Sequence, residues 1–420
     1  MFNLNKGILS HVIAFIAMIV IALAFFSPVL EGKVLRQYDI SQQRAMGAEM
    51  RKYRDDLGRN IYWSNNMFGG MPTYQTSSFR GSNLLNWVPV TLDKIFKRPS
   101  SIFLLGMISF YILALLLGFS PWLGLIGAFC FSFSTNSLVL IEAGHTSKTI
   151  VIQLLPIILA GILLVFEKKK YLSGTIIFAL GMGLALGANH PQMLYFFLIT
   201  LLVYGIIKVV DAVKNNELSH FAKSVGLLVV GLILALASSS SNIIPTLEYQ
   251  KDTMRGGQVL ENQDTGQSAG EKKGLEWDYA MQWSNSNVDL MATFIPRAAG
   301  GSSSEEIGTD NKVYKLTRQS RAPTYWGELT FTSGPNYLGI ILLFLGVFAL
   351  FVLKGSVRWW LIGSVLILML LSLGRNFEFL QRIFFDYFPM YSKFRAPSSA
   401  MSVAVLFLPV LGFMGIHQLL

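Results

Sequence analysis

The run ILSHVIAFIAMIVIALAFFSPVL, residues 8–30, decides the fold class of this chain. It contains no Asp, Glu, Lys or Arg, and it is long enough for a helix to cross a hydrocarbon core of roughly 30 Å. Its apolar part is too long for the central region of a signal peptide, and Ser27-Pro28 is not followed by a small-residue cleavage pattern. We therefore expect residues 1–30 to hold an uncleaved first transmembrane helix.

Nine more apolar runs follow along the chain. Each is continuous rather than alternating, which favours membrane helices over the strands of a barrel. They cover 102–119, 121–141, 149–166, 171–188, 193–210, 224–241, 337–353, 359–373 and 399–419. The composition agrees, because 52% of the residues are hydrophobic and 14% are charged. The sequence predicts an all-α polytopic membrane protein with about ten transmembrane helices.

Short basic connections orient these helices. The positive-inside rule places short loops rich in Lys and Arg in the cytoplasm. Three such loops and the N-terminal segment fall on one side; they contain Lys168, Lys169 and Lys170, then Lys208, Lys214 and Lys223, then Lys354 and Arg358, and Lys6. The N-terminus is thus expected in the cytoplasm, and the polar stretches 31–101 and 242–336 become an outer loop and a second outer loop or small domain. Helices two to seven fill 102–241, and helices eight to ten fill 337–420.

The formal net charge of +10 fits this arrangement. The basic residues lie in loops beside the predicted helices, where anionic lipid attracts them. No zinc-finger, RNA-binding or helix-turn-helix pattern accompanies them, so membrane lipid is the expected partner and nucleic acid is not. No P-loop, nucleophile elbow or His-Glu-x-x-His motif is present, which argues against ATP hydrolysis, serine hydrolysis and zincin chemistry. The single cysteine, Cys130, allows no internal disulfide.

Ionisable side chains concentrate in the connections that are predicted to face outward. The cytoplasmic connections hold little beyond their orienting charges, whereas the outward ones hold Asp39, Glu142, His145, Lys148, His190 and Arg395. Outward loops are longer, so some bias is expected, but ionisable residues at a membrane edge often mark function. We therefore predict an outward-facing site.

Asp39 stands near the start of the first outer loop. Its carboxylate could take a proton from an attacking hydroxyl, or Asp39 or Ser41 could cap the helix that follows. In that helix Met46, Met50, Tyr53 and Leu57 form one apolar stripe, and four basic residues lie mostly off it. The pattern suits either an amphipathic helix on the outer membrane surface or a helix packed against the rest of the loop.

The connection at 142–148 combines an acid, an imidazole and an ammonium at the membrane edge. Lys148 could contact a phosphate or extend to the interface as an anchor, and His145 could bind phosphate, carry a proton or ligate a metal. Arg395 could clamp a phosphate bidentately or anchor the last helix. His190 could belong to a plain turn before a proline, and it is also a secondary candidate for the site. Glu142 is a further candidate.

Four aromatic residues mark the second outer stretch. Trp277, Trp283, Tyr325 and Trp326 could line a groove for a glycan or form the core of a small domain. In the first outer loop, Gly69-Gly70-Met71-Pro72 is typical of a tight turn, and its aromatic neighbours could stack on a sugar. Tyr325 and Trp326 are carried forward as secondary site candidates.

Taken in chain order, these stretches resemble the YfhO family of bacterial membrane proteins, which is similar to the GT-C class of integral membrane glycosyltransferases. The resemblance covers essentially the whole chain and rests on Asp39 in the first outer loop, Gly69-Gly70-Met71-Pro72, Gly144-His145-Thr146-Ser147-Lys148, Tyr325-Trp326-Gly327 and Phe394-Arg395-Ala396-Pro397. Family members are usually longer, so the resemblance implies that further sequence follows residue 420 in such a protein.

The resemblance implies transfer of a sugar from a polyprenyl-phosphate carrier to a cell-envelope glycan or other acceptor, at the outer face of the bacterial cytoplasmic (inner) membrane. The acidic residue of the first outer loop acts in that class as base or metal ligand, and Asp39 matches it. Asp39 has no second acid two residues away, so an acidic metal pair is not supported; a divalent cation stays open. We assign Arg395, Lys148 and His145 to the carrier phosphate from their charge and side, not from the family.

Two other classes compete with a transferase. A secondary transporter or lipid flippase would place polar residues and broken helices near the membrane centre, often in repeated halves. Most predicted span centres here are free of charge, and no matching halves are found, which counts against that class. A scaffold for envelope assembly without catalysis is the third reading.

Overall fold

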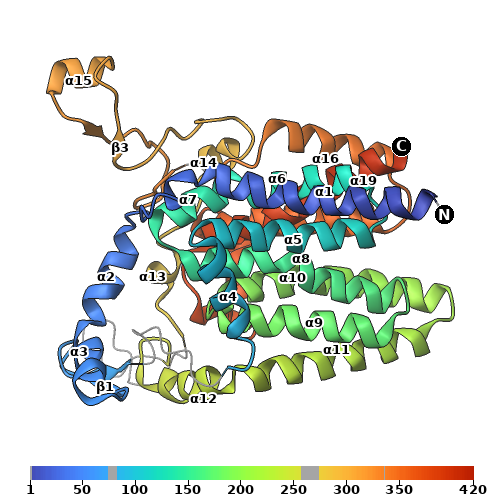
Figure 1. Cartoon of the computed structure of the whole chain (residues 1–420), viewed down its shortest axis with the longest axis horizontal. Helices are drawn as coiled ribbons and strands as arrows, with labels where there is room; N and C mark the ends of the chain where they lie inside the picture. Colours follow the sequence, from blue (N-terminus) through green and yellow to red (C-terminus); the bar gives the residue numbers. More distant parts are fainter. Residues whose placement is uncertain (1, 74–82, 257–273, 335) are drawn as a thin grey trace.

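The computed structural model describes residues 2–73, 83–256, 274–334 and 336–420. It is a bundle of helices lying side by side, with smaller elements gathered at one end (Figure 1). The bundle helices are α1 (Phe2–Phe25), α5 (Ser100–Leu116), α6 (Pro121–Ser132), α7 (Thr135–Ala143), α8 (Thr146–Phe166), α9 (Tyr171–Gly187), α10 (Pro191–Lys214), α11 (Leu218–Ser238), α16 (Ile340–Val352), α17 (Val357–Ser372) and α19 (Met401–Leu419).

The connections carry the remaining elements. Their helices are α2 (Tyr38–Met46), α3 (Ala48–Leu57), α4 (Trp87–Phe96), α12 (Ser240–Tyr249), α13 (Trp277–Met281), α14 (Asn287–Ala292), α15 (Lys312–Thr317) and α18 (Glu378–Tyr387). Two antiparallel strand pairs join β1 (Trp63–Ser64) to β2 (Met71–Pro72) and β3 (Glu305–Glu306) to β4 (Arg321–Ala322). The prediction of an all-helical architecture is thus confirmed for the bundle.

Helix α8 forms the centre of the bundle. Almost all its side chains from Thr149 to Val165 are buried, because α5, α9 and α19 pack around it. A helix that is apolar on every side is typical of such a position. Gly161 allows the closest approach, since a Cβ atom at this position would lie 2.5 Å from the backbone nitrogen of Phe178 in α9. Small residues at helix contacts are a common packing device in membrane proteins.

Five helices, α1, α8, α10, α11 and α19, are long and apolar enough to cross a membrane. The number rises to eight if each of three bent helix pairs is one span, and α9 and α16 are shorter apolar helices. The N and C ends lie at the same end of the bundle (Figure 1), which requires an even number of passes along it. Several helices can therefore cross a membrane, and about ten spans remain a prediction.

The run 121–141, expected as one helix, is broken in the structure. It forms α6 and α7, which meet at an angle of 41°. The break follows from Ser134, whose side chain accepts a hydrogen bond from the backbone nitrogen of Ser137 and so starts a new helix. Runs 102–119 and 359–373 lie within larger bent units, because α4 meets α5 at 119° and α18 meets α17 at 113°.

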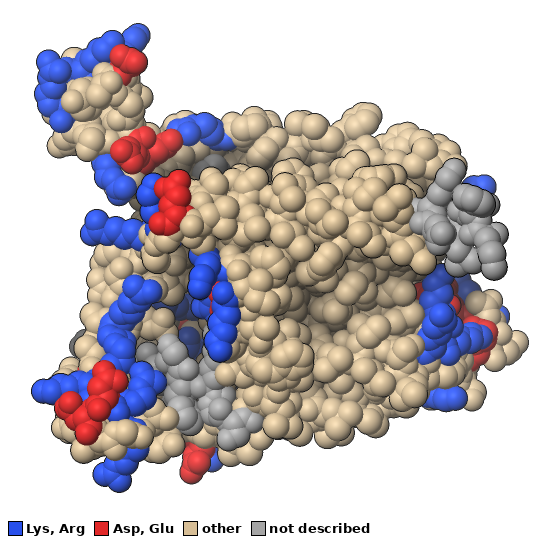
Figure 2. Space-filling model, viewed as in Figure 1, with Lys and Arg blue, Asp and Glu red and all other residues tan. Residues whose placement is uncertain are grey.

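The short basic loops meet at one end of the bundle and contact one another. Lys169 pairs with Glu217 at 2.9 Å, and Lys208 pairs with Glu167 at 2.7 Å. Ser356 donates a hydrogen bond to Asp211 at 2.9 Å. These contacts confirm that the three short loops meet on one side. In the face drawn in Figure 2, charged side chains gather at both ends and the wide middle is largely free of them, as a membrane-crossing bundle requires.

The opposite end carries both long polar stretches. In the first stretch, α2 and α3 run across the direction of α1 (Figure 1). Gly47 separates the two helices, as the C-cap of α2 and the N-cap of α3. The apolar stripe stays uncovered, with Met46 40%, Tyr53 43% and Leu57 53% exposed, so neither helix is packed into a core. The predicted turn at Gly69-Gly70 joins β1 to β2.

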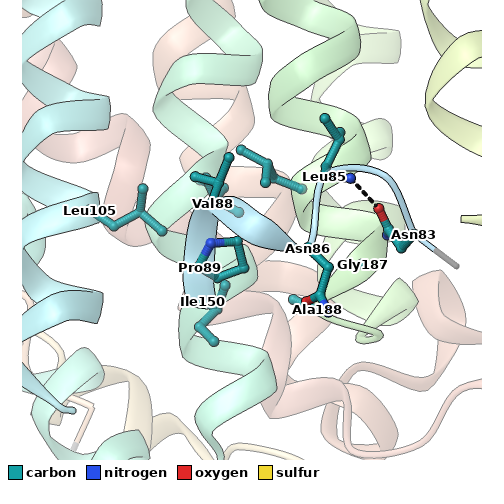
Figure 3. A pocket seen from close by; sticks show the side chains of 11 residues that line it. Asn83, Leu85, Asn86, Val88, Pro89, Leu105, Ile150, Gly187 and Ala188 are labelled. Carbon is teal, nitrogen blue, oxygen red and sulfur yellow. Dashed lines mark hydrogen bonds between the residues drawn. The ribbon is translucent and has the colours of Figure 1, made fainter. Parts of the chain in front are cut away.

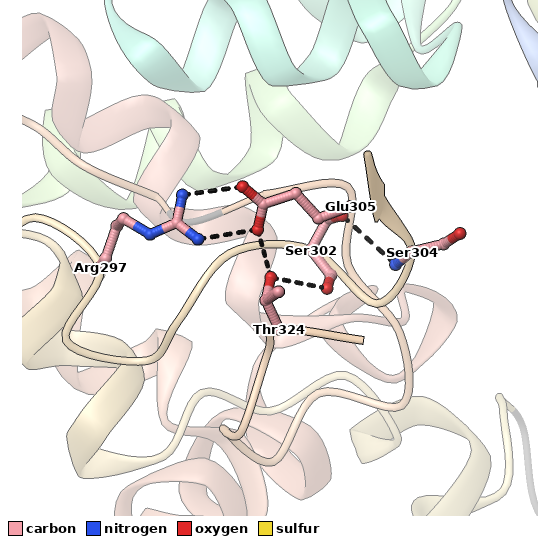
Figure 4. A network of polar contacts seen from close by, with 5 residues as sticks. All are labelled: Arg297, Ser302, Ser304, Glu305 and Thr324. Carbon is pink, nitrogen blue, oxygen red and sulfur yellow. Dashed lines mark hydrogen bonds and ion pairs between the residues drawn. The ribbon is translucent and has the colours of Figure 1, made fainter. Parts of the chain in front are cut away.

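The second polar stretch is tied together at the base of an arm that carries α15 (Figures 1 and 4). Arg297 donates two hydrogen bonds of 2.8 Å to Glu305, and Thr324 donates a third to the same carboxylate. These donors hold the pKa of Glu305 at about 2, well below its ordinary value. A bidentate pair of this kind fixes geometry as well as charge.

Candidate functional site at the polar end of the bundle

Asp39 and His145 contact each other across the first outer loop and the α7–α8 turn. Oδ2 of Asp39 lies 3.0 Å from Nε2 of His145, and both side chains are about half exposed. Gly144 makes the approach fit, because it adopts a φ of +95° and a Cβ atom there would lie 3.0 Å from the Cβ atom of Asp39. Gln37 adds a hydrogen bond to the carbonyl of Ile141. The carboxylate therefore faces an imidazole at the rim of the bundle.

The alternative role of Asp39 or Ser41 as a helix cap is wrong. The N-cap of α2 is Gln37, and no side chain caps this end of the helix. Asp39 lies inside the first turn of α2, and Ser41 donates a hydrogen bond of 2.9 Å to the carbonyl of Gln37. The carboxylate of Asp39 is thus free of backbone capping and available for the contact with His145.

Lys148 lies in the first turn of α8 and reaches the last helix of the chain. Its Nζ atom donates a hydrogen bond of 2.9 Å to Oγ of Ser399, which precedes α19. Within the described residues Lys148 has no carboxylate partner. An ammonium that is paired only with a hydroxyl can still bind an anion as a point charge.

Arg395 is held by contacts with two other outer connections. It donates a hydrogen bond of 2.5 Å to the hydroxyl of Tyr279, and its guanidinium carbon lies 5.4 Å from the ring centre of Trp283. Gln192, from the α9–α10 turn, donates to its carbonyl at 2.6 Å. The guanidinium is therefore positioned by aromatic neighbours, and it forms no ion pair within the described part of the chain.

Arg255 also belongs to this region, although no motif or pattern in the sequence singles it out. Its Nε atom donates a hydrogen bond of 3.1 Å to the carbonyl of Lys393. Burial and the neighbouring charge of Arg395 lower the pKa of Arg255. It lies in a long polar stretch without a motif, so only the folded arrangement shows that it is a neighbour of Arg395.

Electrostatic effects link five of the predicted residues, which we call the polar cluster: Asp39, His145, Lys148, His190 and Arg395. Burial lowers the pKa of His145, and Lys148 and Arg395 lower it further, whereas Asp39 raises it. Burial, followed by Lys148, also holds the pKa of His190 well below its usual range. Both imidazoles are therefore neutral at pH 7. Nδ1 of His190 is buried and has no partner among the described residues.

The other candidates form no hydrogen bond or ion pair with the polar cluster among the described residues. Glu142 is exposed, and no contact in the described structure ties it to the five residues. Tyr325 donates a hydrogen bond of 2.8 Å to Asp289, and Trp326 donates one of 3.0 Å to the carbonyl of Ala298. Both belong to the second outer stretch.

Of the four aromatic residues of the second outer stretch, Trp277 packs against a small buried cluster of Leu275, Ala280 and Met281. Trp326 is 66% exposed, and Trp277, Trp283 and Tyr325 are half-buried. Trp283 packs edge-on against Phe331 at 5.2 Å. The second outer stretch is thus held by polar contacts, by aromatic pairs and by this small apolar cluster.

Two features limit the ligands that this end of the bundle can bind by itself. Within the described ranges, no three His, Cys, Asp or Glu side chains come together as metal ligands. Asp39 and His145 supply two such ligands, so a divalent cation would need further oxygen atoms from a substrate. A neighbouring apolar cavity, lined by residues such as Val88, Leu105 and Ile150 (Figure 3), has a volume of about 30 Å³. That volume suits about one water molecule and no sugar.

The fold defines a helical protein with several helices that can cross a membrane and with a cluster of ionisable residues at one end. Comparisons with protein-family models, with curated proteins and with solved structures find no match. The likeness to the YfhO family and to GT-C enzymes therefore stays a prediction from the sequence.

Proposed function

We propose that this protein is a membrane glycosyltransferase that moves a sugar from a polyprenyl-phosphate carrier to a cell-envelope acceptor at the outer face of the cytoplasmic membrane. One observation carries the proposal. The polar cluster places a carboxylate–imidazole pair beside two cations that have no carboxylate partner in the described residues, and this occurs at the end of an apolar bundle. A base beside cations is what transfer from a phosphate requires.

The residues suit an inverting displacement. Asp39 accepts the proton of the acceptor hydroxyl, whose oxygen attacks the anomeric carbon of the sugar. The bond between that carbon and the phosphate oxygen breaks, and its electron pair stays on the polyprenyl phosphate. Lys148 and Arg395 stabilise the negative charge that grows on the leaving phosphate. The neutral imidazole of His145 donates its Nε2 hydrogen to Asp39 and orients the carboxylate.

A secondary transporter or lipid flippase is the second candidate. The break between α6 and α7 favours it, because polar side chains are buried beside that break. Gln153 of α8 donates hydrogen bonds of 3.1 Å to the carbonyl of Ser132 and to the hydroxyl of Ser137. Broken helices with buried polar groups are common at transport sites.

The test compares lipid-linked sugars and envelope glycans by mass spectrometry. Four strains carry the wild-type gene, no gene, Asp39→Asn, or Asp55→Asn as a matched control on exposed helix α3. We expect the null strain and Asp39→Asn to lose one glycan substituent and to accumulate one polyprenyl-phosphate sugar. Loss of a general base lowers the transfer rate by about 100-fold or more. The Asp55→Asn strain should match the wild type at equal protein level.

Each outcome separates the candidates. If Asp39→Asn transfers at the wild-type rate, Asp39 is not the base. If glycans and carriers are the same in all four strains, the transferase proposal is wrong. Uptake or flipping assays with Gln153→Leu then test the transporter.

A further inference from the structure

Helix α18 turns away from the bundle. It follows α17 after a single turn, Gly374–Phe377, and the two helices meet at 113°. Because this angle is close to a right angle, α18 runs across the end of the bundle instead of along it. This is the end that carries Arg395, since α18 leads directly into the segment 389–397.

One face of α18 is packed against the protein. Gln381 donates a hydrogen bond of 2.8 Å to the hydroxyl of Tyr391. Phe384 packs against the same tyrosine ring at 5.5 Å, and Phe385 meets Trp277 edge-on at 5.2 Å. These contacts fix the rotation of the helix about its axis, so the direction of its other two faces is set.

A second face of α18 is apolar and uncovered. Phe379, Ile383 and Tyr387 follow one another at intervals of four residues and are 75%, 44% and 82% exposed. The third face is charged and consists of Glu378, Arg382 and Asp386. Arg382 pairs with Glu378 at 3.0 Å. A helix with one packed, one apolar and one charged face meets three different environments: protein, lipid and water.

The helix that precedes α18 in the chain also exposes apolar side chains. In α17, which precedes the bend, Leu366 is 50% exposed and Leu370 is 39% exposed. Helix α17 counts as a possible membrane span only together with the helix beyond its bend; in that case its exposed apolar surface faces lipid, and α18 begins directly beyond it. An uncovered row of three large apolar side chains would be unfavourable in water.

Helix α4 repeats the arrangement elsewhere in the chain. It meets α5 at 119°. Its exposed side includes Trp87 at 67% and Ile95 at 64%, and Lys94 lies between them in the sequence. Tryptophan and lysine together are typical of the interface between lipid and water. Both helices thus combine a sharp bend with exposed apolar side chains.

We propose that α18 lies in the interface of the lipid bilayer, with Phe379, Ile383 and Tyr387 inserted among the lipid chains and its charged face toward water. The bilayer is then the binding partner of this surface. The segment after α18 carries Arg395, so the insertion also sets the depth of Arg395 at the level of the lipid headgroups. This inference needs no enzymatic activity and is independent of the proposed function.

Spin labels test the proposal in full-length protein. The chain contains a single cysteine, so Cys130→Ser gives a cysteine-free background. Labels are placed on the apolar face by Phe379→Cys and Ile383→Cys, and on the charged face by Asp386→Cys. Val20→Cys, on an exposed part of α1, gives the lipid reference, and Leu316→Cys, an 85% exposed apolar position in α15, gives the aqueous reference. All variants are reconstituted in vesicles of phosphatidylethanolamine and phosphatidylglycerol.

Collision rates with oxygen and with a water-soluble nickel complex then give the depth of each label. We expect labels at Phe379 and Ile383 to lie about 5–10 Å below the lipid phosphates, and the label at Asp386 to behave like the one at Leu316. Nickel accessibility at Phe379 and Ile383 equal to that at Leu316 would place the face in water and overturn the proposal. Protection of these labels from both reagents would also overturn it, because a second protein copy would then cover the face.

Discussion

The neutral state of His145 is the residue-level feature that the proposed chemistry needs. Its pKa lies below the ordinary 6.5, first because of burial and then because of Lys148. Since the folded pKa lies below that of the unfolded chain, protonation opposes the folded arrangement, and the stabilising contribution is lost as the pH falls below 6.5. Asp39 works in the other direction, because a carboxylate favours the imidazolium.

These opposing effects give a pH experiment that requires no knowledge of the substrate. Diethyl pyrocarbonate modifies neutral imidazole, and mass spectrometry measures the fraction of His145 that has been modified at each pH. We expect modification to be half-maximal below pH 6.5 in the wild type. In Lys148→Met the midpoint should rise, because a neighbouring positive charge is removed, and in Asp39→Asn it should fall.

The matched control is Lys52→Met, on exposed helix α3. Its midpoint should equal that of the wild type. If Lys148→Met leaves the midpoint unchanged as well, Lys148 and His145 do not interact as the structure places them.

Several residues of the candidate site could be selected from the sequence, but the contacts between them could not be predicted. Asp39, Lys148 and Arg395 could be selected because charged residues at the edges of apolar runs are conspicuous. Arg255 and Tyr279 could not, since they lie in a polar stretch where such residues are ordinary. The bond from Arg395 to Tyr279 joins residues 116 positions apart, and no local pattern encodes it.

At the level of elements, the contact between α8 and α9 depends on Gly161. Replacing it with leucine would force side-chain atoms into the backbone of Phe178. We expect Gly161→Leu to cost about 1–3 kcal/mol in stability or more, as overpacking does. Thermal unfolding in detergent measures the loss, with a thiol-reactive dye reporting the exposure of Cys130.

Gly226→Leu in α11 is the matched control, because a Cβ atom there meets nothing within 4 Å. Its midpoint should stay at the wild-type temperature. If both variants unfold together, the close approach of α8 and α9 is not what limits stability.

Helix positions were predictable because continuous apolar runs have few alternatives. The places at which these runs break or bend were not predictable in the same way. Nothing in the composition of 121–141 signals an end, since its serine residues are as compatible with a membrane helix as with a cap. Only the hydrogen bond from the backbone nitrogen of Ser137 to the side chain of Ser134 shows that Ser134 caps a new helix. The bends beside α4 and α18 lie at Pro99 and Gly374, residues typical of helix ends, but neither residue by itself encodes the angles of 119° and 113°.

At the scale of the whole molecule, the two charged ends predict sidedness. The proposed orientation puts the short basic loops in the cytoplasm and α3 outside. In the cysteine-free background, Asp55→Cys should react with a membrane-impermeant maleimide in intact spheroplasts, and Lys169→Cys should react only after lysis. The reverse pattern would invert the topology and place the polar cluster on the cytoplasmic side.

The bond between Lys148 and Ser399 has a consequence for biosynthesis. Its two residues are 251 positions apart. A ribosome adds about 5–20 residues per second, so the interval between them is roughly 10–50 s. During that time Asp39 and His145 have both been synthesised and Ser399 has not. Lys148 therefore lacks its partner Ser399 during this interval, and the contact between α8 and the segment before α19 forms only after the helices between them have been synthesised.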